Sequence, residues 1–189
     1  KVFKVSSVND FTNEKKILDQ IKTISIDDLL GRDAVNPDPN LLGPGIQYKS
    51  ICVTGAAGSI GGELVEQLKN LKPNKIVIID QSEHGLYLIN QRLQNLKTSV
   101  EIIPILGSVS EKLFLEKLIS EFNIDIIFHA AAYKHVPLVE KNPLSGIFNN
   151  VWTTKSVCDA SLKANVSKVM LISTDKAVRP TNVMGASKR

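Results

Sequence analysis

The sequence has few residues of the kinds that build disulfide scaffolds or membrane spans. Its 189 residues include two cysteines, Cys52 and Cys158, without C-x-x-C spacing, which argues against a disulfide framework or zinc site and suits a reducing compartment. The longest stretches without charge, residues 50–62 and 142–154, are far shorter than the roughly 18 to 20 apolar residues that cross a bilayer. We therefore expect a cytoplasmic location, with membrane contact only through segments outside this sequence.

Aromatic residues are also scarce, at 5% of the chain, and no run of Lys or Arg is interleaved with them. A nucleic-acid surface is therefore not expected. The net charge of +4 nonetheless has a pattern: residues 130–189 carry nine basic and three acidic side chains, whereas the preceding residues are close to balance. A phosphorylated small molecule fits this basic segment better than nucleic acid does.

The start of the chain has no natural initiator, because residue 1 is Lys1 and the first methionine is Met170. We therefore expect a piece of a longer protein, from which no signal peptide can be read. The composition changes at Lys49. We interpret residues 1–48 as an extension and residues 49–189 as one truncated globular domain.

From residue 49 on, short β-branched apolar runs alternate with helical patterns. Strands buried on both faces are expected at residues 50–54, 75–79, 100–105, 124–129 and 168–172. Helices are expected between them at residues 61–70, 83–96, 111–122 and 144–164. This alternation predicts an α/β fold, a doubly wound parallel sheet with right-handed crossovers.

The first predicted strand runs into a glycine-rich turn that opens a helix. Its G-x-x-G-x-x-G pattern permits a sharp turn and a close approach of pyrophosphate to the backbone, and the helix N-terminus adds N–H groups and a partial positive charge. A turn that uses glycine for geometry alone is the alternative. The candidate nucleotide-binding residues here are Gly55, Ala57, Gly58, Ser59, Ile60 and Gly61.

The second predicted strand ends at Asp80-Gln81. A carboxylate at this point can accept hydrogen bonds from the adenosine ribose hydroxyls and would repel a 2′-phosphate, so NAD is favoured over NADP. The alternative is an aspartate that only caps the next helix. Ser108 and Val109, after the third strand, are assigned to the same cofactor site.

Small residues and a lysine follow the fourth predicted strand. Three alanines leave room for a ligand at the switch point of the sheet, although close helix packing would also favour alanine. The three histidines of the chain lack metal-ligand spacing, so no metal site is expected. We interpret His129 as a strand-end residue and His135 as the one that faces the ligand. The candidate cofactor residues are Ala130, Ala131, Ala132 and Lys134.

The fifth predicted strand leads into Thr174-Asp175-Lys176, which offers a hydroxyl, a carboxyl and an amine at the carboxyl edge of the sheet. A polar loop with a surface ion pair is the alternative. Further on, Met184 and Lys188 have i, i+4 spacing, so they lie one above the other on a helical face. Considered apart from the other motifs, Lys188 is expected to be a solvated surface lysine.

Together these motifs resemble the extended short-chain dehydrogenase/reductase superfamily. More narrowly, the chain is similar to the long-form, membrane-anchored UDP-N-acetylglucosamine 4,6-dehydratases of bacterial polysaccharide biosynthesis. Four segments carry the similarity: residues 54–61, 80–83, 129–140 and 173–189. The resemblance implies that residues 1–48 join a membrane-proximal region to a Rossmann domain. It also implies that the substrate-binding part lies outside this sequence, so that the fragment alone is inactive.

The resemblance implies NAD as cofactor, UDP-N-acetylglucosamine as substrate and a scaffold on which homo-oligomers are common. Hydride would leave C4 of the hexose, the C5 proton and C6 hydroxyl would be lost as water, and hydride would return to C6. Asp175 would protonate the departing hydroxyl, Lys176 would take the C5 proton, and Thr174 would hydrogen-bond near the C4 oxygen. Lys188 would hold the nicotinamide ribose, and Asn150, the helix asparagine near the site, would contact the cofactor.

One position departs from the superfamily. Most members have Tyr-x-x-x-Lys where this chain has Met184 and Lys188, and methionine cannot transfer a proton. Similarity to the long-form dehydratases favours proton transfer that has moved to Asp175, Lys176 or water. The alternatives are a UDP-sugar epimerase or dehydrogenase, or a non-catalytic nucleotide-binding module. The Asp175-Lys176 pair speaks against simple epimerisation, because that reaction has no leaving group at C6.

Overall fold

The computed structural model describes residues 3–4, 22–23, 38–94 and 99–189. The chain divides into two units, residues 1–37 and 38–189. In the first unit, strands β1 (Phe3–Lys4) and β2 (Lys22–Thr23) pair antiparallel. Most of the predicted extension lies outside the described residues, so its role as a linker stays a prediction.

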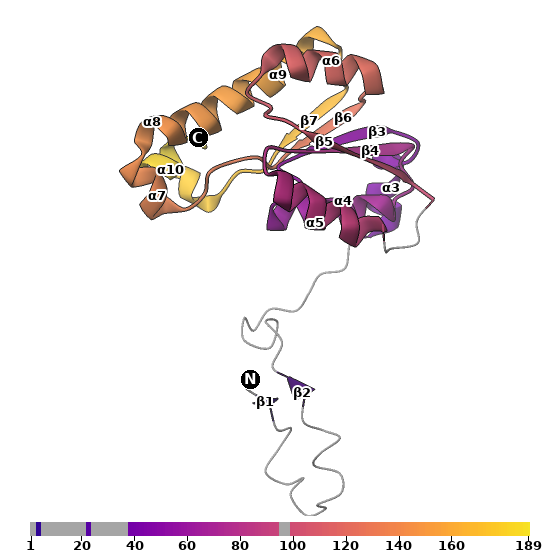
Figure 1. The fold of residues 1–189 in the computed structure, drawn as a ribbon, viewed down its shortest axis with the longest axis horizontal. Helices are drawn as coiled ribbons and strands as arrows, with labels where there is room; N and C mark the ends of the chain where they lie inside the picture. Colours follow the sequence, from indigo (N-terminus) through magenta and orange to yellow (C-terminus); the bar gives the residue numbers. More distant parts are fainter. Residues whose placement is uncertain (1–2, 5–21, 24–37, 95–98) are drawn as a thin grey trace, which may run out of the picture. The chain divides into compact units, whose positions relative to one another are not determined.

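The second unit is built on a parallel five-stranded sheet in the order β5-β4-β3-β6-β7 (Figure 1). Each strand begins and ends within two residues of its predicted range, so the predicted doubly wound α/β fold is confirmed. The order reverses between β3 and β6, which makes this boundary the topological switch point. The strands are β3 (Ser50–Thr54), β4 (Lys75–Asp80), β5 (Glu101–Leu106), β6 (Ile126–His129) and β7 (Lys168–Leu171).

The expected burial on both faces holds for the central strands and is wrong for the outer two. β3 and β6 are buried at every residue, and β4 at its four central residues. β5 and β7, in contrast, have exposed apolar side chains, among them Leu106 and Leu171. An outer strand has one neighbour instead of two, and a run of apolar residues does not reveal that position in the sheet.

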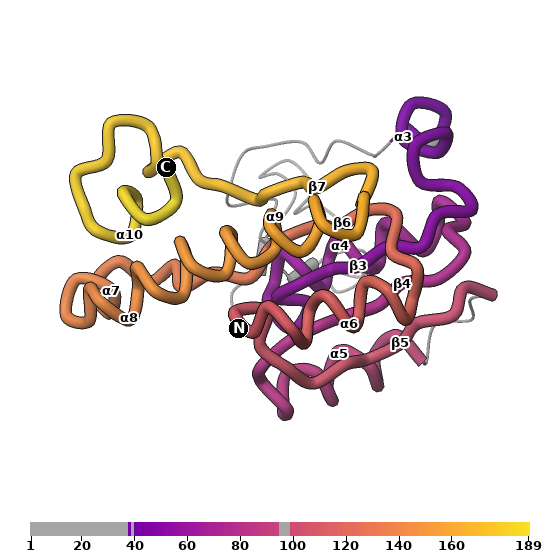
Figure 2. The backbone as a smooth tube through the Cα atoms, turned by 90° about the horizontal axis from the view of Figure 1, so that it is seen from above, coloured from indigo at the N-terminus to yellow at the C-terminus, as the bar shows by residue number. Residues whose placement is uncertain are grey.

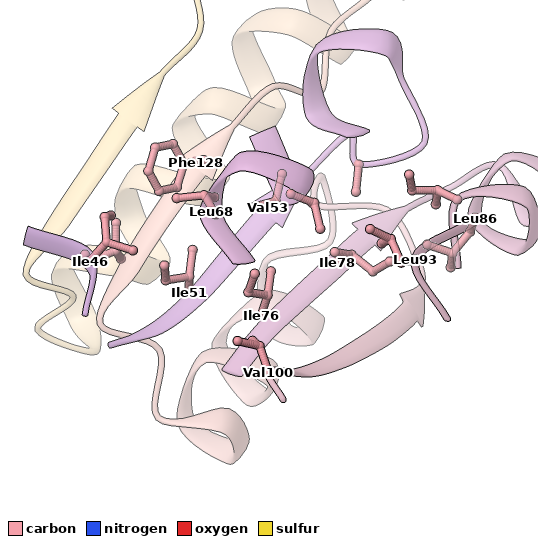
Figure 3. Close-up of a cluster of buried hydrophobic side chains, with 14 residues drawn as sticks. Ile46, Ile51, Val53, Leu68, Ile76, Ile78, Leu86, Leu93, Val100 and Phe128 are labelled. Carbon is pink, nitrogen blue, oxygen red and sulfur yellow. The ribbon is translucent and has the colours of Figure 1, made fainter. Parts of the chain in front are cut away.

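Helices cover both faces of the sheet, and each face has its own apolar core. Helices α4 (Ser59–Lys69) and α5 (Glu83–Gln94) lie on one face, while α6 (Lys112–Phe122) and α9 (Thr153–Lys163) lie on the other (Figure 1). Successive strand residues point to opposite faces, so each strand supplies both cores. Figure 3 shows the first core, which includes Ile51, Val53, Leu68, Ile76, Ile78, Leu86 and Leu93. The second core includes Cys52, Val77, Ile79, Leu115, Leu118 and Val157.

Helix α3 (Pro39–Ile46) precedes the sheet and belongs to the same unit. It falls within residues 1–48, the predicted extension, yet its Ile46 is buried in the first core. The unit therefore begins before the composition change at Lys49. A short helix with two glycines and two prolines has too weak an apolar pattern to be predicted as part of a core.

The predicted helix at 144–164 consists of three elements, α8 (Pro143–Ile147), a π-helical turn η2 (Phe148–Trp152) and α9. Helix α7 (Val136–Lys141) precedes them. After β7 follow a 3₁₀ turn η3 (Asp175–Ala177) and helix α10 (Val183–Ala186), which lies beside α7 and α8 (Figure 2). Across the described residues, no helix is both long and apolar enough to cross a membrane.

Candidate functional site

A cleft of about 540 Å³ opens at the switch point, where loops after the parallel strands meet. Its lining includes nearly all the residues that sequence motifs assign to the site, although these lie up to 133 positions apart in the chain, from Gly55 to Lys188. The predicted residues in the lining are Gly55, Ala57, Gly58, Ser59, Ile60, Gly61, Asp80, Gln81, Ser108, Val109, Ala130, Ala131, Ala132, Lys134, Thr174, Lys176, Met184 and Lys188.

The glycine turn after β3 leaves no space for side chains at two positions. Gly55 has a φ of +67°, and a Cβ there would lie 2.6 Å from the Ala131 backbone. A Cβ on Gly61 would lie 2.2 Å from the Gly55 carbonyl oxygen. Gly58 is the N-cap of α4, and no side chain of the described residues caps this helix. The terminal N–H groups of α4 are therefore available to an anion in the cleft.

Asp80 ties the glycine turn to the end of β4. Its Oδ2 accepts a hydrogen bond from the Ala57 N–H at 3.0 Å, and its Oδ1 accepts one from the Ser82 N–H at 2.9 Å. The cap of α5 is instead the Ser82 hydroxyl, which accepts from the Gly85 N–H at 3.2 Å. Each carboxylate oxygen has two lone pairs, so Asp80 keeps acceptor capacity toward the cleft that it lines.

Two of the three lysines that line the cleft, Lys134 and Lys188, come from distant segments. Lys134, after β6, donates from Nζ to Ser59 Oγ at 3.3 Å, at the start of α4. Lys188, after α10, donates from Nζ to the Ile172 carbonyl at 2.8 Å. Burial lowers the pKa of Lys188, and the positive charge of Lys134 lowers it further. An anion bound beside the glycine turn would offset this repulsion between the two ammonium groups.

Only two of the three polar side chains in Thr174-Asp175-Lys176, after β7, line the cleft. Thr174 and Lys176 line it, whereas the side chain of Asp175 is 87% exposed and does not. Thr174 Oγ1 donates to Asp175 Oδ1 at 2.9 Å, and Lys176 Nζ lies 3.4 Å from the same oxygen. The Thr174 hydrogen bond first, and then Lys176, holds the pKa of Asp175 below its usual value. These contacts must change before Asp175 can donate a proton, and its role as an acid stays a prediction.

Asn150 does not line the cleft, so its predicted cofactor contact needs correction. Its buried carboxamide joins two segments that do: Oδ1 accepts from the Tyr133 N–H at 2.8 Å, and Nδ2 donates to the Tyr133 carbonyl at 3.0 Å and to Ser187 Oγ at 2.8 Å. Oδ1 also accepts from Asn149 Nδ2 at 3.2 Å. This uses the carboxamide's full hydrogen-bonding capacity within the protein. Asn150 therefore positions the cleft lining.

Other residues of the site are not assigned a role by the sequence motifs. Glu140 of α7 accepts from the Val183 N–H at 2.6 Å and so holds the start of α10. Tyr133 and Thr153 also line the cleft. His135, predicted to face the ligand, is the exposed N-cap of α7 and does not line the cleft. These outcomes depend on contacts between distant segments, which no local motif encodes.

The strand order, the glycine turn at the switch point and the polar residues gathered there define a Rossmann domain of the extended short-chain dehydrogenase/reductase class. The family model for the polysaccharide biosynthesis protein family matches residues 51–189, and the chain belongs to this family.

Similar proteins are longer than this chain. It is 40% identical over its full length to the capsular polysaccharide biosynthesis protein CapD of Staphylococcus aureus, of which it covers 32%. Over 142 residues, 74% of the chain, it is 37% identical to a UDP-N-acetylglucosamine 4,6-dehydratase (inverting) of Campylobacter jejuni, of which it covers 40%. The chain thus spans about a third and two fifths of the length of these relatives.

A solved structure has the same fold. The UDP-glucose 4-epimerase of Bifidobacterium longum, crystallised in complex with NAD⁺ and UDP, matches 74% of the chain and 45% of its own with a TM-score of 0.64. The two sequences are 24% identical over this match, so the likeness shows the shared fold.

Proposed function

We propose that this chain is the NAD-binding part of a UDP-N-acetylglucosamine 4,6-dehydratase that acts in bacterial polysaccharide biosynthesis. One observation carries the proposal: Thr174, Lys176, Met184 and Lys188 line the same cleft as the glycine turn. The Thr174 hydroxyl, the lysine amines and a glycine turn of the dinucleotide-binding type therefore line one cleft, where a single ligand would contact all of them. The 37% identity to a dehydratase of this specificity supports the choice of substrate.

The residues present fit NAD. Gly55 and Gly61 allow a tight turn packed against the backbone of Ala131 and of Gly55 itself. The N-terminus of α4, which no side chain of the described residues caps, offers N–H groups to a pyrophosphate, and Lys134 and Lys188 would balance its charge. The Asp80 carboxylate would accept hydrogen bonds from the ribose hydroxyls and repel a 2′-phosphate. When bound, NAD would supply a hydride acceptor that also returns the hydride.

The chain's own residues would manage the protons of the reaction. Lys176 would remove the proton at C5 of the sugar, a step that requires its neutral amine. Thr174 would donate a hydrogen bond near the C4 oxygen, and Asp175 would protonate the departing C6 hydroxyl. To donate this proton, Asp175 must give up its contacts with Thr174 and Lys176 and contact the substrate instead. The bound substrate would also exclude water from the Asp175 carboxyl.

Met184 supports proton transfer by these residues. It is buried, with 2% exposure, and lines the cleft with Lys188, where most of the superfamily has tyrosine. A thioether holds no transferable proton. Any acid or base acting in this cleft must therefore come from elsewhere in its lining or from water. Lys176, in the turn η3 after β7, is a lining residue with a basic side chain.

Substitution of Lys176 tests the proposed reaction. In a protein that carries this chain over the full length of its relatives, we expect UDP-N-acetylglucosamine to lose one water, as measured by mass spectrometry. Lys176→Ala should lower the rate by about 10²- to 10⁴-fold, the usual contribution of a general base, and leave NAD⁺ affinity unchanged. The matched control Lys117→Ala alters an exposed lysine of α6 that does not line the cleft.

Three results would overturn the assignment. Near-normal turnover in Lys176→Ala would exclude this residue as the base. A product of unchanged mass but altered sugar configuration would identify an epimerase. NAD⁺ binding without any change in UDP-N-acetylglucosamine would identify a nucleotide-binding module.

A further inference from the structure

His129 is a buried histidine with a polar partner on each side of its ring. It ends β6, is 1% exposed, and lies in register with Thr54, the last residue of β3. Its Nδ1 is 2.7 Å from Thr54 Oγ1, and its Nε2 is 3.2 Å from Thr154 Oγ1 on α9. The imidazole therefore connects both strands at the switch point to the helix that covers them.

The direction of these hydrogen bonds follows from proton counting. Thr154 Oγ1 donates to the Asn150 carbonyl at 2.7 Å, and a hydroxyl has one hydrogen. The contact with His129 must then run from Nε2–H to the Thr154 oxygen. In a neutral imidazole this leaves Nδ1 without a proton, so Nδ1 accepts from the Thr54 hydroxyl. Burial, and then the charge of Lys188, lowers the pKa of His129 to about 4, which is consistent with a neutral ring.

The Asn150 carbonyl, which accepts the hydrogen bond from Thr154, lies in the π turn η2. A π turn shifts the usual hydrogen bonds of a helix and is frequent at functional sites. Here Thr154 binds the Asn150 carbonyl, and Thr153 donates in the same way to the Asn149 carbonyl. The Asn150 side chain, on the same turn, joins Tyr133 to Ser187, the residue before Lys188.

We propose that His129 is a positioning residue of the cleft. As a neutral imidazole protonated on Nε2, it fixes Thr154, which holds the π turn that directs Asn150 to Tyr133 and Ser187. A strand-end histidine that never touches the ligand thus determines where Lys188 stands. The expected effect on NAD⁺ affinity rests on the proposed function, whereas the proton arrangement does not.

Histidine NMR tests the proton arrangement directly. Long-range ¹H–¹⁵N spectra of the chain report the tautomer of each of its three histidines. We expect His129 to be neutral and protonated on Nε2 down to about pH 5. The charged group that acts on His129 is Lys188, and its polar neighbours are the hydroxyls of Thr54 and Thr154.

Substitutions separate positioning from general packing. Thr154→Val keeps the side-chain shape but removes the hydroxyl, so the contacts with His129 and with the Asn150 carbonyl are both lost and the side-chain signals of both residues should shift. NAD⁺ affinity should fall about two- to tenfold, as when the displaced Lys188 loses one hydrogen bond to the cofactor. Thr154→Ser should restore both. Thr153→Val alters the neighbouring carbonyl contact and should leave the His129 ring signals in place.

The proposal is overturned if His129 is protonated on Nδ1, if it titrates near 6.5, or if Thr154→Val leaves the Asn150 signals unmoved. A folded wild-type chain that binds no NAD⁺ but shows the expected tautomer and shifts would contradict the proposed function and leave the positioning role standing.

Discussion

At the scale of the residue, the cleft depends on glycines at close backbone contacts and on polar side chains that form hydrogen bonds within the protein. Gly55 and Gly61 allow the backbone of the turn to pack closely, while Asp80 Oδ2 accepts from the Ala57 N–H and so holds that turn against β4. The same carboxylate therefore serves structure and, as we propose, ribose recognition. Loss of Asp80 would consequently disturb the turn as well as any ligand contact.

Gly61→Ala tests whether the close approach at the turn is required. The added Cβ would lie 2.2 Å from the Gly55 carbonyl oxygen, so the turn must shift. We expect the free energy of unfolding to fall by about 1–3 kcal/mol, as in an overpacked core, and NAD⁺ affinity to fall with it. Chemical denaturation and calorimetry measure both.

The matched control is Gly45→Ala in α3, where nothing lies within 4 Å of the new Cβ and no proline follows. Alanine there should stabilise the helix by about 0.5–1 kcal/mol. If both variants were equally stable and bound NAD⁺ equally well, the turn would not need glycine at residue 61.

Residue motifs predict the cleft lining well because they lie at strand ends, which a parallel sheet brings to one edge. Asp80, which ends β4, and Thr174, which follows β7 closely, reach the cleft for this reason. Asn150 and His135 do not follow the prediction, because their orientation depends on a π turn and on a helix start. The role that we propose for His129 could not be predicted either, since its partners are 75 and 25 residues away.

At the scale of the element, the short helix α10 is held from both ends. Glu140 of α7 accepts from the Val183 N–H at its start, and Asn150 donates to Ser187 Oγ at its end. A four-residue helix is not stable alone, so these contacts and packing against α7 and α8 determine its position. Lys188 follows directly after this anchored segment.

Glu140→Ala should loosen α10 without unfolding the sheet. The Val183 N–H would lose its acceptor, at a cost of about 0.5–2 kcal/mol, as for a removed helix cap. Hydrogen exchange followed by NMR should show faster exchange at Val183 and unchanged exchange in β3. Glu121→Ala, an exposed glutamate of α6, is the control. Equal hydrogen-exchange protection of the Val183 N–H in the wild-type chain, Glu140→Ala and Glu121→Ala would show that α10 does not depend on Glu140.

Element boundaries are predictable where hydrophobic periodicity is strong and less so elsewhere. All five strands of the sheet follow from apolar runs, but the outer positions of β5 and β7 do not. The helix predicted at 144–164 is interrupted by η2, where two adjacent threonines bind backbone carbonyls. Helical periodicity is too coarse to reveal one additional residue in a turn.

At the scale of the whole molecule, buried His129 links stability to pH. Its pKa falls from 6.5 in the unfolded chain to about 4 in the folded one, so between these values only the unfolded chain binds the proton. The free energy of unfolding should therefore decrease by about 3 kcal/mol as the pH falls from 6.5 to 4. Denaturant titrations at several pH values measure this slope.

Histidine variants identify the source of the slope. His129→Gln should flatten it, and His135→Ala, which removes an exposed histidine, should leave it unchanged. Asp159 and Asp175 act at lower pH, because their pKa values are lowered from 3.8. An unchanged slope in folded His129→Gln would contradict the neutral, buried imidazole.

The central claim is that the cleft at the switch point is an NAD site, and calorimetric titration of dinucleotides into this chain tests it most directly. We predict saturable one-to-one binding of NAD⁺, weaker binding of NADP⁺ because of Asp80, and loss of binding in Gly61→Ala. A folded chain that gives no binding signal with either dinucleotide would contradict the claim.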